Sequence, residues 1–291
     1  MTSTLKFRIA ASVLLSAAAC GFSCFAAASQ TVETALHQLI EQAAAAEFRG
    51  DYRLARDTYT RASIQFPQSS EAWAALGEHI RFYVHDADAA AAAFQKALHA
   101  EQQIPYAAAY ALRGLGELEI KAGHTDEGVA LLKKSLAAYA LADTHRSLCH
   151  LYCRQRKFTE AAAEAHAAVE INPDDAIARL LYAAQLQRAG EAAAAHAEFL
   201  KALAIGGMDS HGETDKPVHC CVLYNAAGYL SVAGQNDAAL KMLRRFFETP
   251  NHRHLSQDDI VNDSDFENLK NSSAFQVLLA SNFKEPPPQS R

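Results

Sequence analysis

The chain has 291 residues, of which 21% are charged and 50% are hydrophobic, and its formal net charge is −6. This mildly acidic balance excludes the clustered positive charge that binding to nucleic-acid phosphates requires, so we expect no nucleic-acid partner. Much of the apolar content is alanine, the strongest helix former, and no strand-like alternation of apolar and polar residues is sustained. The composition predicts an all-α protein.

The first segment, residues 1–28, has the layout of a secretory signal peptide. Two basic residues precede an uncharged stretch from Ile9 to Ala19, which is shorter than the ~20 residues of a membrane span. Small residues end the segment, so we predict cleavage before Ser29 and export to the periplasm. The alternative is a bacterial lipoprotein signal ending at Cys20, which would anchor the protein to the envelope through a lipid. Removing the segment takes away two of the 27 basic residues and none of the 33 acidic ones, which changes the net charge to −8.

After the signal, a pattern of large and small apolar residues repeats at a spacing of 34 residues. Leu148, Tyr152 and Ala161 are followed 34 positions later by Tyr182, Leu186 and Ala195. In the second unit the pattern fits only if one residue is inserted near His85. The units are predicted at residues 36–69, 70–104, 109–142, 142–175, 176–209 and 220–253.

The segment Trp73-Ala74-Ala75-Leu76-Gly77 and the unit end Asn172-Pro173 resemble the tetratricopeptide repeat family. Departures from the family pattern are Gly128, which replaces the usual alanine at a helix crossing, and Arg179, which takes a slot that is usually apolar. The resemblance implies a right-handed superhelical solenoid of about six helix-turn-helix repeats, because one unit cannot bury its apolar face alone. It also implies that the first helices of all units line a concave surface.

The array, predicted over residues 29–253, contains a polar, glycine-bearing loop from Gly206 to His219 that we expect to be a solvated insertion. Residues 254–284 are predicted to be a helical cap, because their aromatic and leucine side chains would cover the apolar end of the stack. Residues 285–291 are predicted to be a disordered tail after three consecutive prolines.

No motif of a phosphate-binding loop, a nucleophile turn, a zinc protease or a dinucleotide fold occurs, so we predict that the protein is not an enzyme. Cys149 and Cys153 lie four residues apart on one predicted helix, and Cys220 and Cys221 are adjacent. With His145 and His219 they suggest a metal site, but the spacing matches no zinc pattern. We therefore expect packing roles for the cysteines, and neither a metal nor a cofactor.

The concave surface is the predicted functional site. Three of its arginines, Arg146, Arg154 and Arg188, are expected to form a positive strip that faces an acidic or carboxylate-bearing segment of a partner. The predicted partner-binding residues are Arg113, Arg146, His150, Arg154, Arg188, Tyr224 and Asn225. The predicted function is a non-catalytic scaffold of the cell envelope that binds a protein or peptide in the groove. The alternative is a periplasmic module that binds a small ligand, or serves a transporter, through the same cavity.

Overall fold

The structure is a computed structural model that describes residues 34–214, 217–249 and 255–283. The predicted signal peptide, with both of its processing sites, and the predicted tail at 285–291 lie outside the described residues. Across the described ranges the chain is helical without a strand, apart from one isolated bridge between Ser69 and Gln102. The predicted all-α class is confirmed. No helix in these ranges has the length and apolar character needed to cross a membrane.

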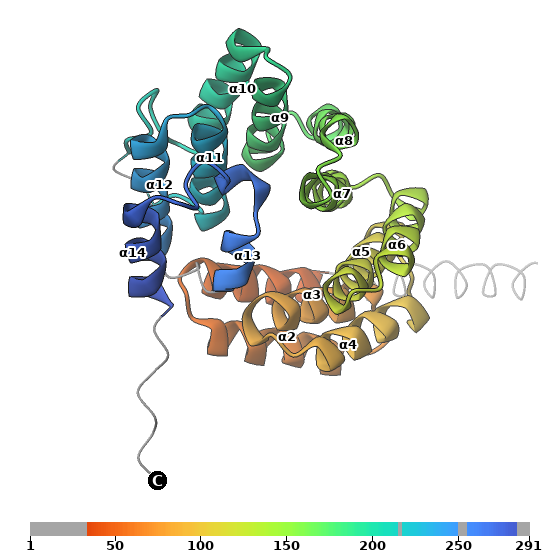
Figure 1. Cartoon of the computed structure of the whole chain (residues 1–291). Helices are drawn as coiled ribbons and strands as arrows, with labels where there is room; N and C mark the ends of the chain where they lie inside the picture. The colour runs from red at the N-terminus through yellow and green to blue at the C-terminus, as the bar shows by residue number, and fades with distance from the viewer. Residues whose placement is uncertain (1–33, 215–216, 250–254, 284–291) are drawn as a thin grey trace, which may run out of the picture.

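The helices follow one another in pairs joined by short turns, as the predicted solenoid requires (Figure 1). A helix at residues 34–48 precedes α2 (Tyr52–Gln65). The following pairs are α3 (Ser70–His79) with α4 (Ala87–His99), α5 (Pro105–Ala122) with α6 (Thr125–Ala138), α7 (Ala142–Arg154) with α8 (Phe158–Ile171), α9 (Ala176–Arg188) with α10 (Ala192–Ile205), and α11 (Cys220–Val232) with α12 (Asn236–Glu248). The chain ends with α13 (Gln257–Val261), the 3₁₀ turn η3 (Ser264–Phe266) and α14 (Ser273–Asn282). Figure 1 shows that the first helices of successive pairs form the inner side of a curved stack, with α13 inside the curve.

The turns between paired helices use the left-handed backbone conformation. Gly123, Gly190 and Gly234 have φ of 96°, 83° and 75°, values that glycine adopts without steric cost. Arg156 stands at the equivalent place between α7 and α8, and it adopts the same conformation with φ of 59°. The turn geometry therefore belongs to the repeat, and an arginine is tolerated where its side chain remains exposed to solvent.

The extra residue of the second unit is accommodated in the helix backbone. After α3 the chain continues as a π-helical turn, η1 (Ile80–Val84), and His85 ends it with φ of 59°. A π-helical turn inserts a residue into a helix without breaking it, and such turns are frequent at functional sites. The insertion that the repeat pattern requires near His85 is thus found at η1.

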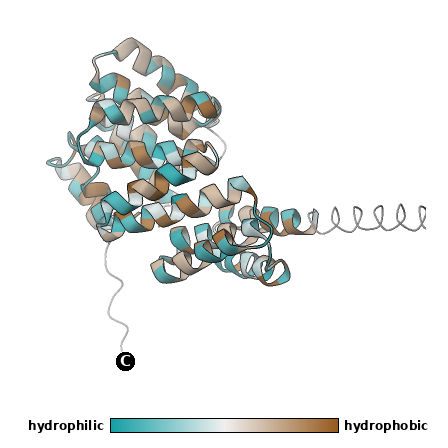
Figure 2. Cartoon of the chain, turned by 90° about the vertical axis from the view of Figure 1, so that its right-hand side faces the viewer, coloured by the Kyte–Doolittle hydropathy of each residue, from teal (hydrophilic) through white to brown (hydrophobic). Residues whose placement is uncertain are grey.

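The stack is held together by amphipathic helices whose apolar and polar positions interleave along the ribbon (Figure 2). Phe94 of α4 is fully buried between α3 and α5. A Cβ added at Gly77 would lie 2.6 Å from its ring, and one added at Gly114 would lie 2.3 Å from it. Only glycine at these two positions leaves room for the ring, which explains a large residue beside two small ones.

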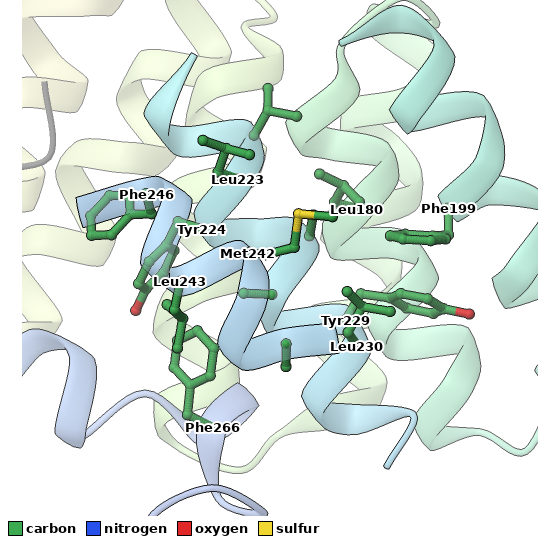
Figure 3. Packing of buried hydrophobic residues seen from close by; sticks show 14 of the residues in the cluster. Leu180, Phe199, Leu223, Tyr224, Tyr229, Leu230, Met242, Leu243, Phe246 and Phe266 are labelled. Atoms are coloured by element: carbon green, nitrogen blue, oxygen red, sulfur yellow. The ribbon is translucent and has the colours of Figure 1, made fainter. Parts of the chain in front are cut away.

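The largest apolar cluster joins the last two helix pairs to the closing helices (Figure 3). Phe199 of α10 stacks on Tyr229 of α11 with ring centroids 4.5 Å apart. Tyr224 of α11 meets Phe266 of η3 edge to face at 5.2 Å. Phe266 and Phe275 are fully buried, so the residues after α12 close the apolar end of the stack.

Candidate binding surface

The inner side of the stack is covered in its C-terminal half by the chain itself. We call residues 257–269, which contain α13 and η3, the closing segment. Its apolar side chains Ile260, Phe266 and Leu269 are fully buried in the cluster around α11. Its acidic side chains are Asp258, Asp259, Asp263, Asp265 and Glu267. The segment therefore presents carboxylates to the surface that the sequence predicts to be positive.

Two of the predicted partner-binding residues hold carboxylates of the closing segment. Arg188 of α9 donates to Asp265 at 2.6 Å, and Tyr224 of α11 donates to Asp263 at 2.7 Å. A Cβ added at Gly228 would lie 2.9 Å from Asp265, so α11 has a glycine where the carboxylate approaches it. At Arg188 and Tyr224 the inner surface therefore holds an acidic segment of the same chain, where the sequence predicted a segment of a partner.

Burial and a neighbouring charge change the protonation of Asp263. Desolvation, followed by the charge of Asp265, raises the pKa of Asp263 to about 7. Burial lowers the pKa of Arg188, but the charge of Asp265 outweighs it and raises that pKa, so Arg188 is charged at any physiological pH. The Arg188–Asp265 pair therefore carries the ionic contact, while Asp263 is close to half protonated near neutrality.

Arg113 and Arg146 are also paired within the chain. Arg113 is 5% exposed and contacts Glu78 at 2.8 Å and Glu117 at 2.9 Å. Burial raises the pKa of Glu117, but Arg81 and Arg113 overcome it and lower that pKa to about 2. This network links α3, η1 and α5.

Arg146 of α7 pairs with Asp143 one turn earlier and with Asp175 at 3.4 Å. Asn225 is buried and donates to the carbonyl of Cys221 at 2.8 Å within its own helix. Arg146 and Asn225 thus have partners inside the array, as Arg113 does. The predicted strip of three free arginines is not continuous, because Arg146 and Arg188 are neutralised in place.

An open basic patch remains at the ends of α5 and α7. Arg154 and Lys121 are exposed. Burial raises the pKa of Asp259 in α13, but hydrogen bonds from Ser256 outweigh it and lower that pKa, with smaller contributions from the charges of Lys121 and Arg154. His150 is exposed as well, and desolvation by the surrounding protein lowers its pKa. Lys121, His150 and Arg154 are named the basic patch below. Sequence reasoning missed Lys121, which lies on the same helix as the predicted residue Arg113.

Comparison with known proteins supports the repeat assignment. A family model described as tetratricopeptide repeat matches residues 79–143, from the end of α3 into α7. A chain of the APC/C hetero-tetramer Cut9–Hcn1 is similar over 83% of this chain and 48% of its own, at 12% identity and a TM-score of 0.52. Pseudomonas aeruginosa pilF is similar over 77% of this chain and 97% of its own, at 15% identity and a TM-score of 0.46. A tetratricopeptide repeat protein from Parabacteroides merdae covers 84% of this chain and 98% of its own, at 16% identity and a TM-score of 0.41. No curated protein sequence matches the chain.

Proposed function

We propose that this chain, which belongs to the tetratricopeptide repeat family, is a non-catalytic interaction scaffold whose inner surface binds an extended acidic segment of a partner protein. The fold itself suggests a protein-interaction scaffold, because stacked helix pairs present a long curved surface. The observation that carries the finer proposal is the closing segment. Tyr224 holds the carboxylate of Asp263, 39 residues further along the chain, and Arg188 holds that of Asp265, 77 residues further along.

The basic patch is the part of that surface that is available to a partner. Arg154 makes no ion pair within the described residues, His150 lies one turn before it on α7, and Lys121 acts with Arg154 on the pKa of Asp259 in α13. Arginine forms forked hydrogen bonds to carboxylates, and a partly enclosed position strengthens them relative to water. A partner segment with two or more Asp or Glu residues would bind along the patch beside α13, and its affinity would fall with added salt.

Crosslinking in the producing cell tests this proposal. A photoreactive residue in place of His150 in the full chain should capture a protein, whereas the same residue in place of Lys133, exposed on α6, should not. Reversing the patch with Lys121→Glu and Arg154→Glu should abolish the capture. The matched control Lys133→Glu and Lys134→Glu changes the net charge equally and should leave it intact. Capture that survives the first pair, or is lost equally in the control, would refute the proposal.

The cellular compartment is a separate part of the proposal. From the layout of residues 1–28 we propose that the protein acts in the periplasm, or at the envelope through a lipid on Cys20. N-terminal analysis of the mature protein should find Ser29 or a lipidated Cys20 as the first residue. A mature protein that retains Lys6 would overturn the assignment.

No observation favours the small-ligand alternative. Two hollows in the described part of the chain have volumes of about 400 and 380 Å³ and are open depressions. Neither is bordered by a residue predicted to bind a partner.

A further inference from the structure

The junction between the long loop and α11 brings together three soft metal ligands. His219, Cys220 and Cys221 each offer one donor atom, and these atoms lie within 4.8 Å of one another. The two sulfur atoms are 3.9 Å apart. Cys220 is buried, Cys221 is half-buried and His219 is exposed, so the cluster extends from the protein interior to the surface.

We propose that His219, Cys220 and Cys221 bind one Cu(I) ion in a three-coordinate site of two sulfurs and one nitrogen. Thiolates select soft cations such as Cu(I) and Zn²⁺. With metal–sulfur bonds of about 2.3 Å, sulfurs 3.9 Å apart subtend an angle of about 116° at the metal, which is close to trigonal geometry.

The imidazole is oriented for this role. Nδ1 of His219 accepts a hydrogen bond from the amide of Cys221 at 3.3 Å, so its lone pair is directed at the first turn of α11. An ion bound there takes over this lone pair.

The binding step balances without a redox reaction. Cu(I) forms two bonds to sulfur and one to nitrogen, the two thiols each release a proton to solvent, and copper remains in the reduced state in which it is supplied. Burial raises the pKa of the Tyr83 phenol, and the charges of Glu47 and then Cys220 raise it further. Tyr83 of η1 therefore lies close to the site. The second unit of the array thus borders the site.

Competition with bicinchoninate, a coloured chelator of Cu(I), tests the proposal under anaerobic, reducing conditions. All samples are full chains with Cys20→Ser and Cys24→Ser, which leaves four cysteines. One equivalent of Cu(I) should transfer from the chelator to this chain. The further pair Cys220→Ser and Cys221→Ser should abolish the transfer, whereas the control pair Cys149→Ser and Cys153→Ser should retain it. Absence of transfer to the four-cysteine chain, or its loss only in the control pair, would overturn the assignment.

The coordination geometry gives a second, independent readout. X-ray absorption on the copper-loaded chain should show two sulfur neighbours and one nitrogen, and His219→Ala should remove the nitrogen. Circular dichroism of each variant confirms that the helices are intact. Copper bound by sulfur alone, or shared between two chains, would contradict a site built from these three residues.

Discussion

Asp263 is the residue whose charge acts most directly against docking of the closing segment. Its pKa is about 7 in the folded chain, against 3.8 for the free side chain, because of burial and then the neighbouring Asp265. A raised carboxyl pKa means that the folded chain binds the extra proton, so stability falls as the pH rises through the window from about 4 to 7. The whole pKa difference would lower the free energy of unfolding by about 4 kcal/mol at pH 8. Because solvent partly screens the half-buried carboxylate, we expect a loss of about 2 kcal/mol.

Asp263→Asn removes this charge and retains an oxygen that can accept from the backbone of Asp265, as Asp263 does at 2.9 Å, while its amide can donate to the hydroxyl of Tyr224, from which Asp263 accepts at 2.7 Å. Urea unfolding at pH 8 should therefore show the variant to be more stable than the parent, and the gain should nearly vanish at pH 4. Asp258→Asn, at an exposed position of α13, is the matched control and should change little at either pH. A variant that is equally destabilised at pH 4 and pH 8 would show that the carboxylate is needed for its hydrogen bonds and that its charge is not the cost.

Three further predictions concern packing and the ionic contact. Gly114→Ala places a methyl group 2.3 Å from the ring of Phe94 and should cost about 1–3 kcal/mol in urea unfolding, with partial recovery on adding Phe94→Leu; an unchanged midpoint would contradict the packing argument. Trp73 is half-buried and donates to the carbonyl of Pro67 at 2.9 Å, so Trp73→Ala should cost about 2 kcal/mol, below the ~3–5 of a fully buried ring; a loss under 1 kcal/mol would place it at the surface. Arg188→Ala leaves the carboxylate of Asp265, which is 8% exposed, without its cation and should cost about 3 kcal/mol at pH 7, measured by thermal unfolding; a neutral outcome would mean that Asp265 is solvated.

The helical repeat could be predicted because its signals are local. A spacing of 34 residues and the alternation of large and small side chains report on contacts between neighbouring helices. The same regularity locates the extra residue near His85, which the backbone accommodates as η1. Even Arg156, which breaks the glycine pattern of the turns, keeps the turn conformation because the surrounding helices fix it.

The state of the inner surface could be predicted only in part, because charge pairing depends on contacts that no repeat spacing encodes. The spacing places Arg154 and Arg188 at the same point of adjacent units. It contains no information on the closing segment, which reaches Arg188 from 77 residues away. An acidic run after the last repeat was visible in the sequence, and its complementarity to the arginines was the available signal. Opposite charges on one chain are expected to pair where the fold brings them together. Of Arg146, Arg154 and Arg188, only Arg154 makes no ion pair within the described residues.

The relative position of Lys121 and Arg154 depends on a polar junction between α6 and α7. Ser135 donates to the carbonyl of Ala109 at 2.8 Å, and its oxygen lies 2.9 Å from the hydroxyl of Thr144, with both side chains fully buried. Ser135→Ala alone should cost about 1–3 kcal/mol, because the Thr144 hydroxyl is then left buried without a partner. Adding Thr144→Val, which keeps the shape, removes that orphaned group and should restore most of the loss. A double variant no more stable than Ser135→Ala would mean that the orphaned Thr144 hydroxyl is not the source of the stability loss. If the double variant recovers the lost stability, these hydrogen bonds hold α5, α6 and α7 in their relative positions and thereby set the spacing of the basic patch. Ser135→Ala should then also lower crosslinking from position 150.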